Sequence, residues 1–189
     1  TTDRFFEVNV SIIEEELGSV EYNFNGTNYA MYNEYLYAAY NFDNRSSLGE
    51  NDTYILDISG NGHDGTAVDG AVLNTTNYRY GYAMQFKGDA SDSRVIIGTG
   101  TDFSDVCDEG CTFTSWVYPY DDGIDKHIVS RSDIADDNRF FRFSLSPDNR
   151  LNFYINYNGN LTYCRAFDPD YNLPYEDWSF VTGIYNTTH

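Results

Sequence analysis

The stretch from Asp57 to Thr66 concentrates the side chains best suited to bind a ligand or to fix a loop. It reads Asp-Ile-Ser-Gly-Asn-Gly-His-Asp-Gly-Thr, with glycines set among carboxylate, amide and hydroxyl groups. Glycine tolerates positive φ, and Asp, Asn and Ser side chains bond to nearby backbone, so the stretch predicts a tight loop. Its G-x-G-x-x-G spacing does not predict a dinucleotide site. No helix follows, and Asp64 would face the pyrophosphate.

Two interpretations of this loop stay open. The side-chain oxygens of Asp57, Asn61 and Asp64 could hold a structural Ca²⁺, a cation that prefers oxygen ligands. The loop lacks the closing bidentate Glu of an EF-hand, however. The alternative is that Asp57 caps backbone amides in a tight turn. Two further aspartates at the ends of predicted strands are rival calcium ligands: Asp43 and Asp89.

A polar strand face is the best candidate for a binding surface. In the predicted strands around Arg142, Tyr154 and Asn156, polar residues alternate with apolar ones, which places these three on one face. Aromatic rings stack on sugar faces, while Arg and Asn hydrogen-bond hydroxyl groups. Trp116 could belong to the same surface. The competing interpretation is that Trp116 and Tyr154 are core or merely solvent-facing side chains.

No catalytic constellation is recognisable. A glycosidase needs two carboxylates spaced for acid and nucleophile roles. The acidic runs at 14–16 and 176–177 are placed in a turn and a loop, and no strand carries such a pair. None of His63, His127 and His189 accompanies a nucleophile motif. We therefore expect no enzymatic activity.

The charge of the chain excludes some partners. The 189 residues include 30 acidic and 11 basic side chains, a net charge of -19. Such a chain repels phosphate backbones, so nucleic acid is not an expected partner. No apolar run of membrane-spanning length occurs, so this segment is not expected to insert into a membrane.

Sequons and cysteines both indicate a location outside the cell or on its surface. Cys107 and Cys111 close a short loop, for which a disulfide is expected in an oxidising compartment; a zinc site is the weaker alternative. Asn-x-Ser/Thr sequons predict a secreted glycoprotein. They stand at Asn9, Asn25, Asn44, Asn51, Asn74, Asn160 and Asn186.

Short alternating runs separated by turn residues predict an all-β fold. Residues 1–34 resemble a separate β-hairpin element, or the end of a preceding β domain, with its turn at Asn25-Gly26. Residues 35–189 predict an antiparallel sandwich or barrel. The strands expected there cover 35–42, 54–56, 66–73, 94–98, 113–118, 127–131, 139–145, 151–156, 161–167 and 178–185.

An ordered set of motifs in residues 36 to 189 resembles the laminin-G-like, concanavalin A-like jelly-roll family of lectins and glucanases. The motifs are Ala39-Tyr-Asn-Phe-Asp43, Asp57 to Thr66, Gly81-x-Ala-Met-x-Phe-x-Gly88, Phe113-Thr-x-Trp-Val117 and Trp178-x-x-Val-Thr-x-x-Tyr185. The resemblance, closest to versions in archaeal surface proteins, implies two packed antiparallel sheets, often with structural Ca²⁺. It also implies binding of glycans or proteins at the concave face or rim.

The resemblance also implies a further hairpin and a closing strand after Trp178, so the domain is expected to lack its last strands. An unpaired edge is a template for strand addition. We therefore expect a non-catalytic, glycosylated extracellular domain for adhesion or recognition, with glycans or other surface proteins as partners. The alternative is a structural subunit of a filament or surface layer, in which copies of the chain bind each other.

Overall fold

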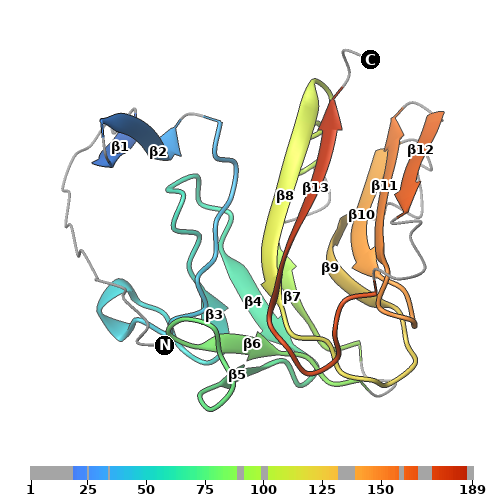
Figure 1. Ribbon diagram of the computed structural model, residues 1–189. Helices are drawn as coiled ribbons and strands as arrows, with labels where there is room; N and C mark the ends of the chain where they lie inside the picture. The colour runs from blue at the N-terminus through green and yellow to red at the C-terminus, as the bar shows by residue number, and fades with distance from the viewer. Residues whose placement is uncertain are drawn as a thin grey trace. The chain divides into compact units, whose positions relative to one another are not determined.

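The computed structural model describes residues 19–24, 26–33, 35–88, 92–98, 102–131, 139–157, 160–165 and 172–186. These residues form β-strands and one short 3-10 helix, and none is α-helical. The chain divides into two compact units, Thr1–Tyr37 and Ala38–His189. Figure 1 shows the strands, and the expected all-β fold is confirmed.

The first unit contains one antiparallel hairpin. β1 (Ser19–Phe24) pairs with β2 (Thr27–Asn33), and Gly26 has a φ of 82° in the turn between them. Positive φ at this position is what an Asn-Gly hairpin turn requires. The hairpin expected from the sequence is therefore present. The residues before Ser19 lie outside the described part of the chain, and so do the predicted glycosylation sites Asn9 and Asn25.

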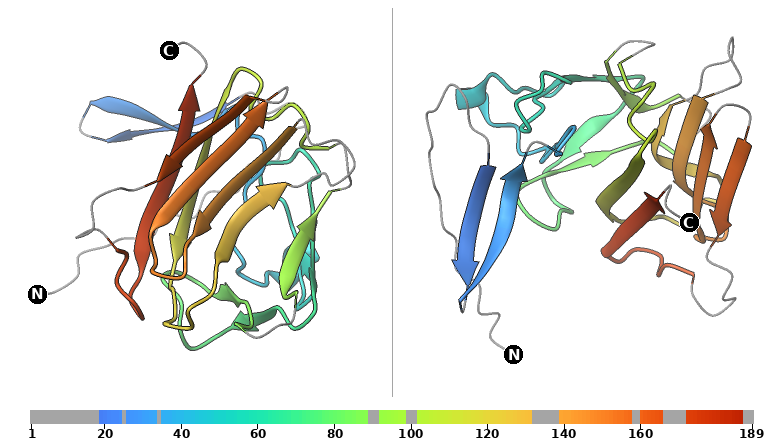
Figure 2. Two further views of the ribbon diagram at one scale, coloured as in Figure 1. Left: turned by 90° about the vertical axis from the view of Figure 1, so that its right-hand side faces the viewer. Right: turned by 90° about the horizontal axis from the view of Figure 1, so that it is seen from above.

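The second unit is built around a four-stranded antiparallel sheet in the order β12-β11-β10-β9. Figure 2 shows its strands side by side. The bounds are β9 (Lys126–Arg131), β10 (Arg139–Leu145), β11 (Leu151–Tyr157) and β12 (Asn160–Arg165). The alternation of apolar and polar residues predicted β10 correctly, because Phe141, Phe143 and Leu145 are all buried on one face of this strand.

A second sheet, of β8 (Gly110–Val117) and β13 (Ser179–Asn186), packs on this apolar face. The Phe113 ring lies 4.9 Å from that of Phe141 and 5.7 Å from that of Phe153, centroid to centroid. On β13, a Cβ added to Gly183 would lie 3.0 Å from the Phe143 ring. The two inner faces thus form one core with the packing of a sandwich.

Two smaller sheets complete the unit. One has the order β3-β4-β7 and the other pairs β5 with β6. Their bounds are β3 (Tyr54–Ile55), β4 (Gly65–Val68), β5 (Val72–Asn74), β6 (Ala83–Gln85) and β7 (Arg94–Ile97), and the 3-10 helix η1 covers Ser46–Leu48.

Two predicted strands are wrong. Residues 36–45 are irregular, because Phe42 and Asn44 adopt positive φ (58° and 53°) and turn the backbone away from an extended path. The single strand expected over 66–73 is broken between β4 and β5. There Asp69 and Gly70 adopt φ of 53° and 88°.

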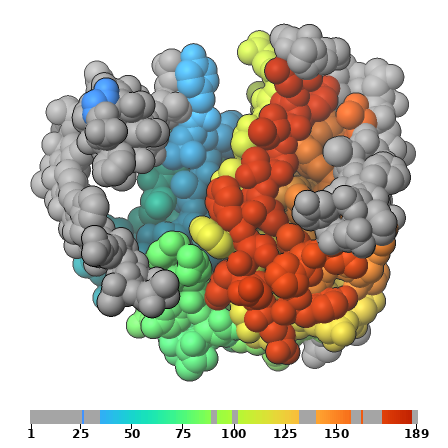
Figure 3. Space-filling model, viewed as in Figure 1, coloured from blue at the N-terminus to red at the C-terminus, as the bar shows by residue number. Residues whose placement is uncertain are grey.

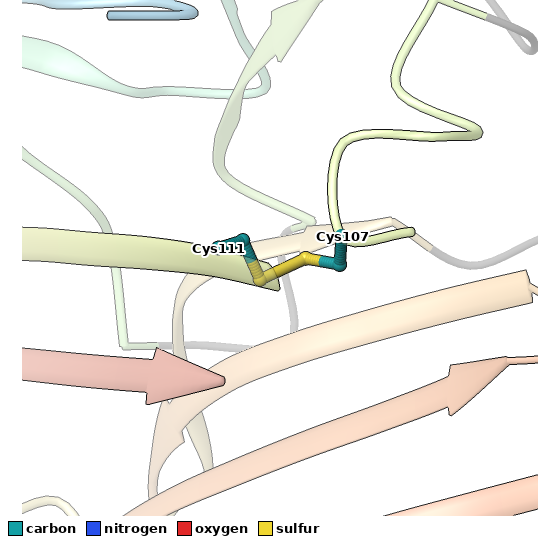
Figure 4. Close-up of a disulfide and its surroundings, with 2 residues drawn as sticks. All are labelled: Cys107 and Cys111. Atoms are coloured by element: carbon teal, nitrogen blue, oxygen red, sulfur yellow. A yellow bond between two sulfur atoms is a disulfide. The ribbon is translucent and has the colours of Figure 1, made fainter. Parts of the chain in front are cut away.

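The predicted disulfide between Cys107 and Cys111 is confirmed. The cysteines have Cα atoms 4.8 Å apart, and the bridge joins the preceding loop to the start of β8 (Figure 4). Cys107 is 8% exposed and belongs to the same core as Phe141 and Val181. The bridge therefore fixes the entry of β8 into the sandwich.

Replacing both cysteines by alanine is expected to lower the free energy of unfolding by about 2 kcal/mol, the loop-entropy value for so short a ring. Urea denaturation of the double variant and the oxidised parent measures the difference. Equal midpoints and slopes would show that the bridge adds no stability.

Candidate functional site

The Asp57 carboxylate lies at the centre of the loop expected to bind a cation or to cap a turn. It is 4% exposed. Oδ1 accepts hydrogen bonds from the backbone N–H groups of Ala39 (2.9 Å) and Ser59 (3.0 Å). Oδ2 accepts from the Ser59 hydroxyl (2.8 Å) and the His63 N–H (3.1 Å). One side chain thus joins three separate backbone positions.

Hydrogen bonds also set the charge state of this carboxylate. Burial alone would raise the pKa of Asp57, but the donors on Ala39, Ser59 and His63 favour the ionised form and lower the pKa below its ordinary value. Nearby, burial and the negative charges of Asp57 and Asp64 raise the pKa of Tyr40, so its hydroxyl stays protonated and donates to the His63 carbonyl. Asp57 is therefore a stable buried anion.

A second aspartate closes the loop from its other end. Asp64 Oδ1 accepts from the Asp57 N–H at 2.9 Å, and Oδ2 accepts from the Tyr54 hydroxyl. That hydrogen bond is the main cause of a raised pKa for Tyr54. Both aspartates direct their oxygens at protein donors.

The Asp57 carboxylate accepts four hydrogen bonds and has no lone pair left for Ca²⁺, whereas Asp64 accepts two and keeps two. Calcium binding in this loop stays a prediction. Asn61 is exposed, and Asp43 accepts from Arg45 (3.3 Å) and the Tyr82 N–H (3.4 Å). Asp89 lies outside the described residues. Within the described part of the chain, no three His, Cys, Asp or Glu side chains are grouped to hold a metal.

Four of the predicted glycosylation sites have described side chains. Asn51 and Asn186 are exposed, while Asn44 and Asn74 are half-buried. In Asn51 and Asn74, the side-chain oxygen accepts from the hydroxyl of the sequon threonine at 3.0 Å. Asn160 begins β12. Glycosylation stays a prediction at all seven positions.

The structure brings together three of the four predicted ligand-binding residues. Arg142 and Tyr154 stand directly opposite each other on β10 and β11, and Asn156 is opposite Phe140 on the same face. The Arg142 guanidinium carbon lies 5.8 Å from the centroid of the Tyr154 ring. All three named side chains are half-buried on the outer face of the four-stranded sheet.

Polar residues fill the centre of this outer face. Ser144 and Asn152 face each other across β10 and β11 and are 3% and 5% exposed. Beside them, Arg142 lies over the Tyr154 ring within cation–π distance. Hydroxyl, amide, guanidinium and aromatic groups thus share one surface, the outer polar face.

Sequence alternation missed two members of the outer polar face. His127 lies opposite Ser144 and Ser130 lies opposite Arg142, although an odd spacing normally separates faces. A register shift between Phe143 and Ser144 puts both residues on one side, as a β-bulge does. Burial, followed by the positive charge of Arg142, lowers the pKa of His127, so its ring is neutral near pH 7.

Trp116 lies on a different surface from the other three. It projects from the outer side of β8, opposite Phe180 of β13, and is 39% exposed. Strand β8 pairs with β13 and not with β9 to β12, which a local pattern cannot reveal. Arg79 and Tyr80, which sequence analysis did not single out, contact the Trp116 ring.

The arrangement of two face-packed antiparallel sheets agrees with comparison to known families. The model of the concanavalin A-like lectin/glucanases superfamily, of the laminin G type, matches residues 89–189. The chain belongs to this superfamily. The match covers β7 to β13, which include both sheets of the aromatic core. No curated protein and no solved structure matches the chain.

Membership of the superfamily gives a coarse functional class. Laminin-G-like domains suggest carbohydrate or protein binding outside the cell and are generally non-catalytic. The disulfide fits an oxidising compartment. Among the described residues, the structure contains no helix of the length and apolarity that a membrane span requires.

Proposed function

We propose that this lectin-like domain is a non-catalytic extracellular module that recognises glycans through the outer polar face. The observation that carries the proposal is the cation–π contact of Arg142 with Tyr154, 5.8 Å from guanidinium carbon to ring centroid. The ring contact favours this position of the guanidinium, and its planar fork of donors can bind a ligand oxygen. Preorganised groups of this kind lose little entropy on binding.

The neighbouring groups support hydroxyl recognition over catalysis. Neutral His127, with Ser130 Oγ 3.3 Å from Nδ1, offers hydrogen-bonding atoms without a buried charge. Asn156 adds an amide at the far end of the face. The outer polar face contains no Asp or Glu among its described residues on β9, β10 and β11, whereas glycoside hydrolysis requires a carboxylate pair.

Replacing Arg142 by glutamine is expected to weaken glycan binding about tenfold or more, because a charge-assisted hydrogen bond and the cation–π contact are both lost. Tyr154→Ala should have a similar effect. A glycan array screened with the parent protein identifies the sugar, and titration calorimetry then gives its affinity for each variant.

Arg94→Gln is the matched control. Arg94 is an exposed arginine on β7, in a different sheet from Arg142, and it forms an ion pair with Asp69. It removes the same charge and should leave the affinity unchanged. Absence of any sugar bound by the parent, or equal affinity for the parent and Arg142→Gln, would contradict this function. Circular dichroism confirms that each variant is folded.

A structural subunit of a filament or surface layer is the second candidate. It is supported by the two-stranded β13-β8 sheet, in which each strand has a described partner on one side only. An unpaired strand edge can accept a strand from another copy. Negative-stain microscopy of native material separates the candidates, since isolated globular particles would exclude the filament.

A further inference from the structure

The outer face of the β13-β8 sheet carries an exposed row of aromatic and hydroxyl side chains. Trp116 and Phe180 are directly opposite each other, with ring centroids 5.4 Å apart. The next outward pair is Thr114 and Thr182, and both are exposed. Phe180 is 56% exposed, an unusual position for a phenylalanine. Strand β13 is open to view along most of its length in Figure 3.

An arginine completes this surface. The guanidinium carbon of Arg79 lies 5.0 Å from the centroid of Trp116 and 5.2 Å from that of Tyr80. Tyr80 is 63% exposed and meets Trp116 edge to face at 6.2 Å. We call Arg79, Tyr80, Trp116 and Phe180 the Arg79 cluster. Its aromatic rings hold the cation by cation–π contacts.

Among the described residues, Arg79 has no carboxylate partner, in contrast to three other arginines. Arg45, Arg94 and Arg150 each lie 2.9–3.3 Å from an aspartate. Within the described residues, Arg79 forms no hydrogen bond or ion pair, although the chain has 30 acidic side chains. The cation–π contacts with Tyr80 and Trp116 are made to ring faces and need no N–H hydrogen bond. The fork of N–H donors along the edge of the guanidinium stays available for an oxyanion.

We propose that the Arg79 cluster is a second ligand-binding surface and that it takes a sugar bearing a carboxylate. The Arg79 fork matches a carboxylate in bidentate geometry. Exposed Phe180 and Tyr80 offer rings to the apolar face of a sugar. Thr114 and Thr182 are the next outward-facing pair, about 7 Å along the strands from Trp116 and Phe180, and they offer hydroxyl groups.

The combination favours an acidic sugar over an acidic peptide. A carboxylate, a ring face and a row of hydroxyl groups occur together in a uronic acid unit, whereas an acidic peptide side chain supplies only the carboxylate. The surface lies on a different sheet from Arg142, so this proposal does not depend on the outer polar face.

Titration with trigalacturonic acid and with its methyl ester tests the proposal. The two probes share ring and hydroxyl groups and differ in charge. Trp116 fluorescence should change on binding, because the ring is part of the cluster. We expect the ester to bind at least about tenfold more weakly than the acid. Arg79→Gln should bind the acid more weakly than the parent by a similar factor. The affinity of Arg79→Lys should lie between those of the parent and Arg79→Gln, since an ammonium keeps the charge without the fork of donors.

Arg94→Gln serves as the control and should bind the acid like the parent. Thr114→Val with Thr182→Val should weaken sugar binding without affecting a hexaglutamate peptide. Equal affinity for acid and ester, or unchanged binding by Arg79→Gln, would overturn the proposal. So would a hexaglutamate affinity equal to that of the sugar, or no binding of the acid at millimolar concentration.

Discussion

Replacing Asp57 by asparagine is expected to lower the free energy of unfolding by about 3 kcal/mol or more. The buried carboxylate accepts four hydrogen bonds from Ala39, Ser59 and His63, and an amide has one oxygen to offer. The Asn NH₂ group would face N–H or O–H donors, leaving at least two of them unsatisfied at about 1–3 kcal/mol each. Urea denaturation measures the loss.

The pH dependence of stability gives an independent test of the same carboxylate. Its pKa is lower in the folded protein than in the unfolded chain, so its contribution is complete above the unfolded value of about 4. The contribution is lost as the pH falls from there through the folded pKa. The gap between parent and Asp57→Asn should therefore narrow on acidification.

Asp69→Asn is a suitable control, because Asp69 is an exposed aspartate in a surface ion pair with Arg94. A surface pair contributes about 0–1 kcal/mol. If Asp57→Asn proves as mild as this control, Asp57 is not the organising residue of the loop.

Phe143→Ala is expected to lower the free energy of unfolding of the second unit, Ala38–His189, by about 3–5 kcal/mol. Phe143 is 0% exposed and lies between Phe113, Phe153 and Gly183, so its removal leaves a cavity between the two sheets. The melting temperature should fall by roughly 10 °C. Differential scanning calorimetry measures both effects.

Phe180→Ala provides the comparison within the same residue type. Phe180 is 56% exposed on the outer side of β13, so its truncation should cost less than about 1 kcal/mol. Similar losses for the two alanine variants would mean that the aromatic core does not dominate the stability of the sandwich.

The local sequence pattern was sufficient to predict strands in which one face is apolar and the other is mostly polar. In β10 and β11, apolar residues alternate with polar ones except at Phe140, so the strands, their core face and the grouping of Arg142, Tyr154 and Asn156 could all be predicted. The disulfide followed from the spacing of two cysteines in a short loop.

The local sequence pattern failed where long-range contacts or positive φ determine the backbone conformation and the strand pairing. Nothing in the identity of Phe42 indicates its positive φ, and the Ala39 N–H and C=O bond to Asp57 and Ile58 instead of a strand neighbour. The register shift that brings His127 beside Arg142 depends on pairing between strands. So does the separation of Trp116 from the outer polar face.

The pairing of β8 with β13 has a consequence for how the chain is made. Gly110 pairs with Asn186 and Val117 with Ser179, and four strands lie between the two partners in sequence. During synthesis β8 emerges long before β13, so the backbone N–H and C=O groups along the edge that pairs with β13 are without this partner until then. Contacts so distant in sequence form slowly and leave apolar surface open to aggregation. The β8 edge is therefore exposed to aggregation until β13 has left the ribosome.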